Sequence, residues 1–158
     1  MAAEVSGVSP LSEPAGSAWP AYPRVASRTP GAGAGSLCVA RDFTAGTMRR
    51  WGIGERGDDV VVVVSELLTN ALRYTLPSPV PCWPRWPVRL GLLQRGPWVL
   101  CAVCDPSEEL PVARDPGWYG ESGRGLHVVA SLCDAWGCTQ PGPRGKVVWG
   151  MFETGQRW

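Results

Sequence analysis

The chain is short of four common residue types. Lysine, asparagine, isoleucine and histidine occur once each, as Lys146, Asn70, Ile53 and His127. Arginine supplies the remaining positive charge, so the formal net charge is +1 and nothing biases the whole molecule toward nucleic acid or an anionic membrane surface. With one histidine we find no support for a Ser/His/Asp or Cys/His catalytic arrangement. Because these residue types are so rare here, the positions of the single asparagine and the single lysine are informative.

Long apolar segments and export signals are also lacking. No run approaches the ~18–20 apolar residues that a membrane span needs. The first residues contain Glu4 and no basic region before an apolar core, which is unlike a secretory signal. We therefore expect a cytoplasmic protein that does not bind membranes.

Cysteine is better represented, with six residues. Disulfides are disfavoured in the cytoplasm, and a zinc site would have to use Cys101 and Cys104, which lie three apart in a strand-like run and so point to opposite faces. We expect buried, unreactive thiols and no zinc. No Walker-type G-x-x-x-x-G-K-[ST] motif is present, which excludes the P-loop route to nucleotide binding.

The length of 158 residues fits one domain behind an N-terminal leader. In residues 1–35, 23 positions are Ala, Gly, Pro or Ser and four are Val, Leu, Ile or Phe. Such a segment buries too little apolar surface to offset its ordering entropy. We predict a disordered leader over residues 1–35 and one domain over residues 36–158.

Hydrophobic periodicity predicts three helices and four strands in that domain. The run Val60–Val64 has strand propensity, but an unbroken segment from Asp58 to Tyr74 is too long for an ordinary strand and carries a helical apolar stripe. In chain order the predicted elements are helix 38–51, helix 58–74, strands 88–94 and 98–104, a helix that opens at Gly123-Arg124-Gly125, and strands 135–140 and 146–153. This order predicts an α+β two-layer sandwich, with a sheet covered on one face by three helices. The proline-rich segment 76–87 and the segment 107–122 read as long loops.

Several polar residues could carry chemistry. Glu66 and Asn70 lie four apart on the second helix and project side by side, with Arg73 on the same stripe. A carboxylate beside a carboxamide can bind a divalent cation, or can orient and deprotonate a water molecule. The alternative is that both side chains belong to a polar helix face that is exposed to solvent and has no function of this kind. Asp105 ends an apolar strand, which suits a ligand contact or ordinary turn chemistry.

Two further features of the sequence could bind a phosphate group. Gly123-Arg124-Gly125-Leu126 stands at a helix start, where free N–H groups and the helix dipole favour anions; the alternative is a flexible joint. Lys146 begins the last strand, where it reaches a phosphate or simply lies in solvent.

Together these segments resemble the gyrase/chaperone/histidine-kinase ATPase superfamily. Residues 65–74, SELLTNALRY, look like its N box; Cys104-Asp105-Pro106-Ser107 looks like a reduced G1 box; and residues 120–126, GESGRGL, look like its G2 box. Residues 145–149, GKVVW, match the closing strand of one branch, the anti-sigma factor serine kinases and similar actinobacterial regulators. The resemblance covers roughly residues 37–153 and implies the Bergerat fold, with a mixed sheet.

The resemblance implies an ATP site that also holds Mg²⁺. Asn70 would ligate the metal, Glu66 would be the general base, and Asp105 would accept from the adenine amino group. Residues of the nearby segments would bind the rest of the nucleotide, with 107–122 as a lid: Arg73, Ser107, Gly123, Arg124, Gly125, Leu126 and Lys146.

The chain departs from the family pattern at several of these places. Ser107 and Glu109 stand where the G1 glycines are usual, Tyr74 where a histidine is common, and Lys146 where a threonine is frequent. ATP binding is therefore better supported than kinase turnover.

Two functions remain open, beside a purely structural interaction domain. The first is a serine/threonine kinase that phosphorylates an anti-anti-sigma (antagonist) protein and sequesters a sigma factor, without direct contact to nucleic acid. The second is a catalytically weak, nucleotide-responsive protein-binding module. The sequence leaves open whether the protein is a monomer or a homodimer.

Overall fold

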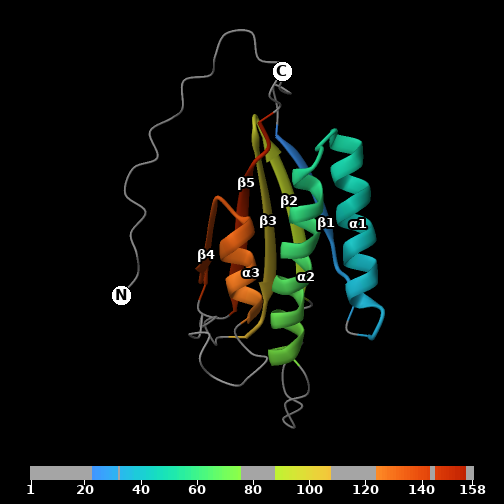
Figure 1. Ribbon diagram of the computed structural model, residues 1–158. Coiled ribbons are helices and arrows are strands. Elements are labelled where there is room, and N and C mark those ends of the chain that lie inside the picture. Colours follow the sequence, from blue (N-terminus) through green and yellow to red (C-terminus); the bar gives the residue numbers. More distant parts are fainter. Residues whose placement is uncertain (1–22, 32, 76–87, 108–123, 143–144, 156–158) are drawn as a thin grey trace.

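The computed structural model describes residues 23–31, 33–75, 88–107, 124–142 and 145–155. Three helices and five strands form within these residues (Figure 1). In chain order they are β1 (Arg24–Arg28), α1 (Ser36–Trp51), α2 (Arg56–Thr75), β2 (Arg89–Arg95), β3 (Trp98–Asp105), α3 (Arg124–Leu132), β4 (Ala135–Thr139) and β5 (Lys146–Glu153).

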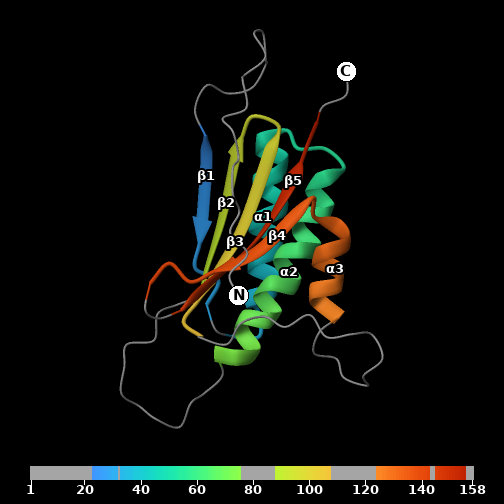
Figure 2. The same ribbon diagram turned by 90° about the vertical axis from the view of Figure 1, so that its left-hand side faces the viewer.

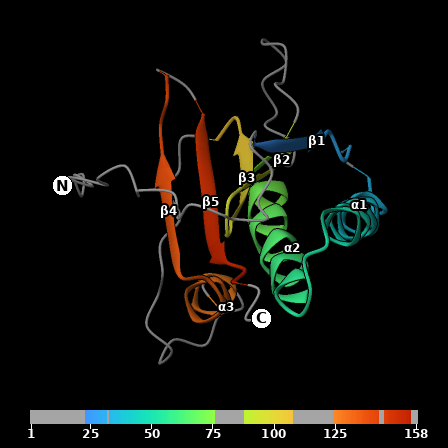
Figure 3. The ribbon, with the colours of Figure 1, turned by 90° about the horizontal axis from the view of Figure 1, so that it is seen from above.

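The strands form one sheet in the order β1-β2-β3-β5-β4. The three helices lie together on one of its faces, which gives two layers (Figure 3). This confirms the predicted α+β sandwich with three helices on one face. One detail was wrong: every neighbouring pair of strands is antiparallel, so the sheet is not mixed. Short connections between consecutive strands favour antiparallel pairing.

β1 lies inside the segment predicted to be a disordered leader. Residues 24–28 pair with β2 at the edge of the sheet, so the prediction is wrong for these five residues. The composition argument missed them because an edge strand is held by backbone hydrogen bonds and needs little apolar burial. Val25 is 71% exposed, and Ala26 alone of the strand packs against the core. Residues 1–22 of the predicted leader, and residue 32, lie outside the described residues.

α2 is the central helix of the layer, and its five valines are helical as predicted. Asp58 and Asp59 occupy its first turn, where the helix dipole favours acidic groups. The buried residues recur at helical spacing: Val60, Val63, Val64, Leu67, Leu68 and Ala71. Tertiary burial of this stripe overrides the strand propensity of valine. Among the described residues no helix is long and apolar enough to cross a membrane.

α1 and α3 flank this helix, and α1 packs mainly through small residues. The buried positions of α1 are Ser36, Ala40, Thr44, Thr47 and Met48. In the same helix Met48 is fully buried, and the larger Phe43 and Trp51 are half-buried. Gly52, with φ of 73°, ends α1 in the left-handed conformation that glycine adopts most readily. In α3, Leu126 and Val129 are buried, whereas Ala130 is exposed.

No helix of the described residues lies on the other face of the sheet (Figure 3). Leu93, Leu100 and Met151 point to this face and are half-buried. The ring of Trp149 lies against Gly137 of the edge strand, where a Cβ would fall 2.7 Å from Cζ2 of the indole. The described helices cover one face of the sheet, as the sequence predicted (Figure 3).

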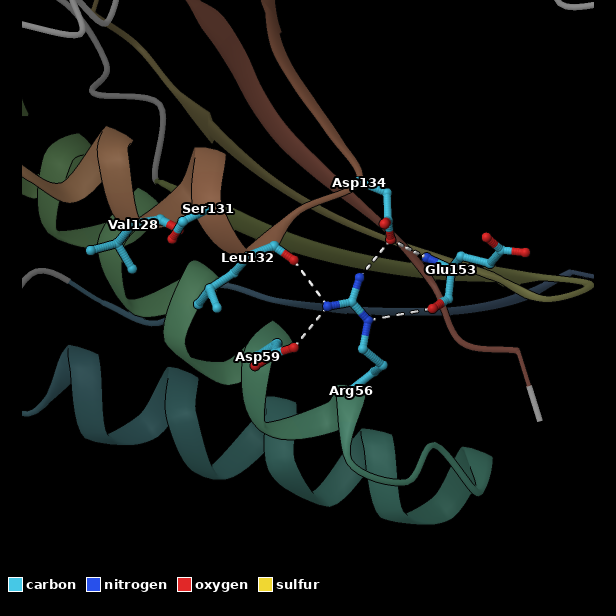
Figure 4. Close-up of polar contacts among 7 residues, drawn as sticks. All are labelled: Arg56, Asp59, Val128, Ser131, Leu132, Asp134 and Glu153. Atoms are coloured by element: carbon cyan, nitrogen blue, oxygen red, sulfur yellow. Dashed lines mark hydrogen bonds and ion pairs between the residues drawn. The ribbon is translucent and has the colours of Figure 1, made fainter. Parts of the chain in front are cut away.

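Arg56 ties α2, α3 and β5 together at one end of the molecule (Figure 4). Its guanidinium lies 2.8 Å from Oδ2 of Asp59 and 2.6 Å from Oδ2 of Asp134, and it donates to the backbone carbonyl of Leu132 at 3.0 Å. It also lies 5.3 Å from the ring centroid of Phe152. Burial alone would lower the pKa of Arg56, but the two carboxylates raise it. The carboxyl end of α3 is therefore held by one planar cation.

Replacing Arg56 by methionine should lower the free energy of unfolding by about 1–2 kcal/mol, since it removes several charged hydrogen bonds that are partly screened by solvent. Urea denaturation measures this change. Arg49→Met, at an exposed position of α1, is the matched control and should change stability by less than ~0.5 kcal/mol. Equal effects of the two variants would contradict the role of Arg56.

The cysteines divide by exposure, which corrects the expectation that all would be buried. Cys101 is buried, whereas Cys38 and Cys104 are exposed. Cys101 faces the helices and Cys104 the opposite side of β3, as their spacing predicted. Burial raises the pKa of Cys101 to about 12. The described residues contain no group of three or more Cys, His, Asp or Glu side chains that could hold a metal ion. Cys82 lies outside them.

The thiol of Cys101 should resist alkylation in the folded protein at pH 8, because it is both inaccessible and un-ionised. Iodoacetamide labelling followed by peptide mass spectrometry measures this. Cys38 should be labelled rapidly under the same conditions, and Cys101 only after denaturation. Labelling of Cys101 at the rate of Cys38 in the native protein would show the packing between β3 and α2 to be wrong.

Candidate nucleotide-binding site

One end of the molecule collects the segments that the sequence singled out. The carboxyl-terminal half of α2, the amino end of α3 and the carboxyl end of β3 lie at this end in two perpendicular views (Figures 1 and 2). The first residue of β5 pairs with the last of β3 and so lies there too. The Arg56 contacts lie at the opposite end. The predicted motifs, up to 80 residues apart in the chain, therefore converge.

Glu66 and Asn70 on α2 both face Gly125 in the first turn of α3. A Cβ built on Gly125 would lie 2.6 Å from Oε2 of Glu66 and 3.8 Å from Nδ2 of Asn70. Both polar side chains are half-buried. Since any larger residue would collide with the Glu66 carboxylate, glycine at this position lets the two helices approach each other. The structure thus brings together two motifs that the sequence placed on separate helices.

The amino end of α3 has the character of an anion site. Its first turn contains no acidic residue. Arg124, at the first helical position, is exposed, and the buried Leu126 anchors the turn against the core. The first N–H groups of a helix lack partners within the helix and form its positive dipole end. Gly123 lies outside the described residues.

Asp105 and Lys146 form a second group at this end. The two residues are paired across β3 and β5, and Nζ of Lys146 lies 3.3 Å from both carboxylate oxygens of Asp105. The backbone N–H of Ser107 donates to Oδ1 of Asp105 at 2.7 Å. Burial raises the pKa of Asp105, and Lys146 opposes this by favouring the carboxylate. Lys146 is therefore buried and paired, and the alternative that its side chain simply lies in solvent is wrong.

Other predicted site residues are not joined to these groups. Arg73 lies one turn beyond Asn70 on α2 and is exposed, and no contact among the described residues links it to Glu66 or Asn70. The predicted lid, apart from Ser107, lies outside the described residues. Sequence reasoning also missed Arg41 of α1, whose Nε donates to Oγ of Ser65 at 2.9 Å beside Glu66. Its exposed place on α1 carries no sequence signal for that contact.

The residues present fit a magnesium nucleotide. Carboxylate and carboxamide oxygens are hard ligands of the kind that Mg²⁺ prefers, and Glu66 and Asn70 supply both within one turn. The absent side chain of Gly125 lets the first turn of α3 lie against Glu66 and Asn70, and the α3 N-terminus supplies N–H donors for phosphate oxygens. The first turn of α3 contains no acidic residue of its own that would repel a phosphate.

Gly125→Ala should weaken binding of Mg-ATP, the ligand that the resemblance implies, by about tenfold or more, since the added methyl group would push the Glu66 carboxylate into the space beside α3 where the phosphates would bind. Calorimetry measures the affinity. The free energy of unfolding should change by less than ~1 kcal/mol, because the end of a flexible side chain can move aside.

Gly46→Ala, in α1, is the matched control, since its Cβ would meet only Nη2 of Arg49 at 3.9 Å. It should leave binding unchanged and raise stability by about 0.5–1 kcal/mol. Unaltered binding by Gly125→Ala would contradict the placement of the site between α2 and α3.

Comparison with known proteins agrees with the fold. No curated protein matches the chain. The family model described as the histidine kinase-like ATPase domain matches residues 32–151, which is most of the chain and includes the Glu66, Asn70, Asp105 and Gly125 positions. The match supports nucleotide binding and agrees with the antiparallel sheet and its three helices. The chain therefore belongs to the histidine kinase-like ATPase domain family.

Proposed function

We propose that the protein is a cytoplasmic, Mg-ATP-dependent regulator that acts as a serine/threonine kinase. Its protein substrate would be an anti-anti-sigma antagonist, and it would sequester a sigma factor until that antagonist binds. The single observation that carries the proposal is the arrangement of Glu66 and Asn70 opposite the glycine at the start of α3. The sigma-factor partners rest on the resemblance to anti-sigma factor kinases.

Each residue has a defined task in this proposal. Asn70 would hold the metal through its amide oxygen, and the N–H groups at the start of α3 would hold phosphate oxygens. Bound Mg²⁺ supplies neutralisation of the phosphate charge. Glu66 would accept the proton of a serine or threonine hydroxyl as that oxygen bonds to the γ-phosphorus and the bond to the β-phosphate oxygen breaks. ADP leaves with the electron pair.

A nucleotide-responsive binding module without turnover is the second candidate. It is favoured by the reduced G1 segment, in which Ser107 replaces a usual glycine and donates its N–H to Asp105. That contact ties the chain directly after β3 to the strand end. A regulator could use such a site to couple nucleotide occupancy to partner binding without phosphoryl transfer.

Nucleotide binding itself is tested with Asn70→Ala by calorimetric titration of ATP with and without Mg²⁺. Loss of the amide oxygen should weaken Mg-dependent binding by about 10- to 100-fold, a typical cost for a metal-site residue. Thr69→Ala, one residue away on the same helix, is the control and should bind as the wild type does. No binding by the wild type at millimolar ATP would overturn both candidates.

Glu66→Ala separates the two candidates. With ATP labelled at the γ-phosphate and antagonist proteins from the same genome, the kinase predicts labelled antagonist that falls by about 10²- to 10⁴-fold in the variant. Binding of ATP should persist in Glu66→Ala. If wild-type labelling does not exceed that of the variant, the kinase is rejected and the binding module stands.

A further inference from the structure

The first strand of the sheet has one edge to which no other described strand is paired. β1 pairs with β2 alone and ends the sheet on the side away from β4 and α3 (Figures 2 and 3). Four of its five residues are exposed, and Ala26 is half-buried. Successive residues of a strand direct their N–H and C=O groups to opposite edges. The outer edge of β1 therefore offers a row of donors and acceptors with which a further strand could pair.

Positive charge is concentrated along this edge. β1 and β2 contain no acidic residue, and an arginine stands at each end of both strands: Arg24, Arg28, Arg89 and Arg95. All four side chains are exposed. Within the described part of the chain, none of them forms an ion pair. Four unneutralised charges on two neighbouring strands exceed the formal net charge of the whole chain, which is +1.

Arg24 and Arg28 lie on one face of β1. They pair with Gln94 and Leu90 of β2, which are buried, so both arginines lie on the helix side of the sheet. Arg24 also donates to the carbonyl oxygen of Trp51 at the end of α1, at 3.4 Å. A strand added beside β1 would lie ~4.8 Å away. Two of its residues, four positions apart, would lie directly opposite the two arginines.

The charges distinguish between the possible occupants of this edge. In a second copy of the chain, the antiparallel register that pairs all five residues of β1 would place Arg24 opposite Arg28 twice. Like charges in directly opposed positions destabilise a strand pair. A nucleic acid supplies negative charge but has no regular row of N–H and C=O groups to pair with a strand edge. An extended acidic peptide supplies both.

We propose that the outer edge of β1 is a docking site for an extended, acidic segment of a partner protein, which adds a strand to the sheet. Backbone hydrogen bonds to β1 would hold the segment, and carboxylates four positions apart would pair with Arg24 and Arg28. The site goes beyond the proposed function, because it uses no residue of the nucleotide site and can be tested without nucleotide.

Strand pairing is tested by fluorescence anisotropy with a labelled peptide, Glu-Thr-Glu-Thr-Glu-Thr-Glu, added to the full-length protein. Two further versions carry backbone N-methyl groups, on the glutamates in one and on the threonines in the other. Only one of these two sets of N–H groups can face β1. One version should therefore bind within about threefold of the parent peptide, and the other at least ~10-fold more weakly.

Equal binding of the two methylated versions would overturn the pairing with β1. The same holds if the parent peptide does not bind at about 1 mM, a concentration that detects even weak docking. Tighter binding of a single-stranded DNA of the same charge than of the peptide would overturn the proposal in favour of a nucleic acid. None of these outcomes bears on ATP binding, which is measured separately.

Charge reversal tests the two arginines. The double variant Arg24→Glu, Arg28→Glu should bind the glutamate peptide at least ~10-fold more weakly, and should bind a lysine-threonine peptide that the wild type does not bind. The control is Arg49→Glu, Arg50→Glu, which makes the same change of charge at exposed positions of α1 and should weaken binding by less than about threefold. Circular dichroism checks the folding of both variants.

Equal weakening by the two double variants would show a diffuse attraction and overturn the docking site at β1. Sedimentation of the wild type and of Arg24→Glu, Arg28→Glu examines the remaining occupant. The proposal predicts the same oligomeric state for both proteins. A wild-type dimer that dissociates in this variant, but not in the control, would assign the edge to a second copy of the chain.

Discussion

The contact between Glu66 and Gly125 is the constraint on which the rest of the site depends. The missing side chain at position 125 allows the first turn of α3 to touch the polar face of α2. Without that approach, the carboxylate and amide of α2 and the free N–H groups of α3 would be separate surface features. With it, metal-ligating oxygens and an anion-binding helix end face one another.

The position of α3 is fixed from its other end as well. Arg56 joins the first turn of α2 to the carboxyl end of α3 and to Asp134, whose carboxylate also accepts the N–H of Glu153 in β5 (Figure 4). α3 is nine residues long, so one cation network and two buried side chains, Leu126 and Val129, are a substantial part of what orients it. A short helix held at its far end can keep its amino end rigid beside the site.

The elements that carry the predicted site residues were easier to predict from the sequence than the contacts between these elements. The helix with Glu66 and Asn70, the helix that starts at Arg124 and the strand that ends at Asp105 were predicted because each carries a local pattern, and tertiary burial accounts for the helix over Val60–Val64. β1 was missed because an edge strand needs no apolar alternation. The contacts of Arg56 join residues that lie up to 97 positions apart in the sequence. Hydrophobic periodicity indicates local structure and cannot predict such contacts.

The burial of Lys146 could not be predicted for a related reason. A lysine at the start of a strand is usually solvated, and only the antiparallel register of β3 and β5 places it opposite Asp105. The rarity of lysine and asparagine in the chain did point to both positions. The composition therefore drew attention to Asn70 and Lys146, whereas the pairing of Lys146 with Asp105 follows from the topology of the sheet.

The central claim is that nucleotide binds between α2 and α3 at one end of the fold. Hydrogen–deuterium exchange with mass spectrometry, with and without Mg-ATP, tests it most directly. The account predicts slower exchange in peptides from the second half of α2 and the start of α3, and no change at Arg56 and the carboxyl end of β5. Protection confined to other segments, with α2 and α3 unaffected, would contradict it.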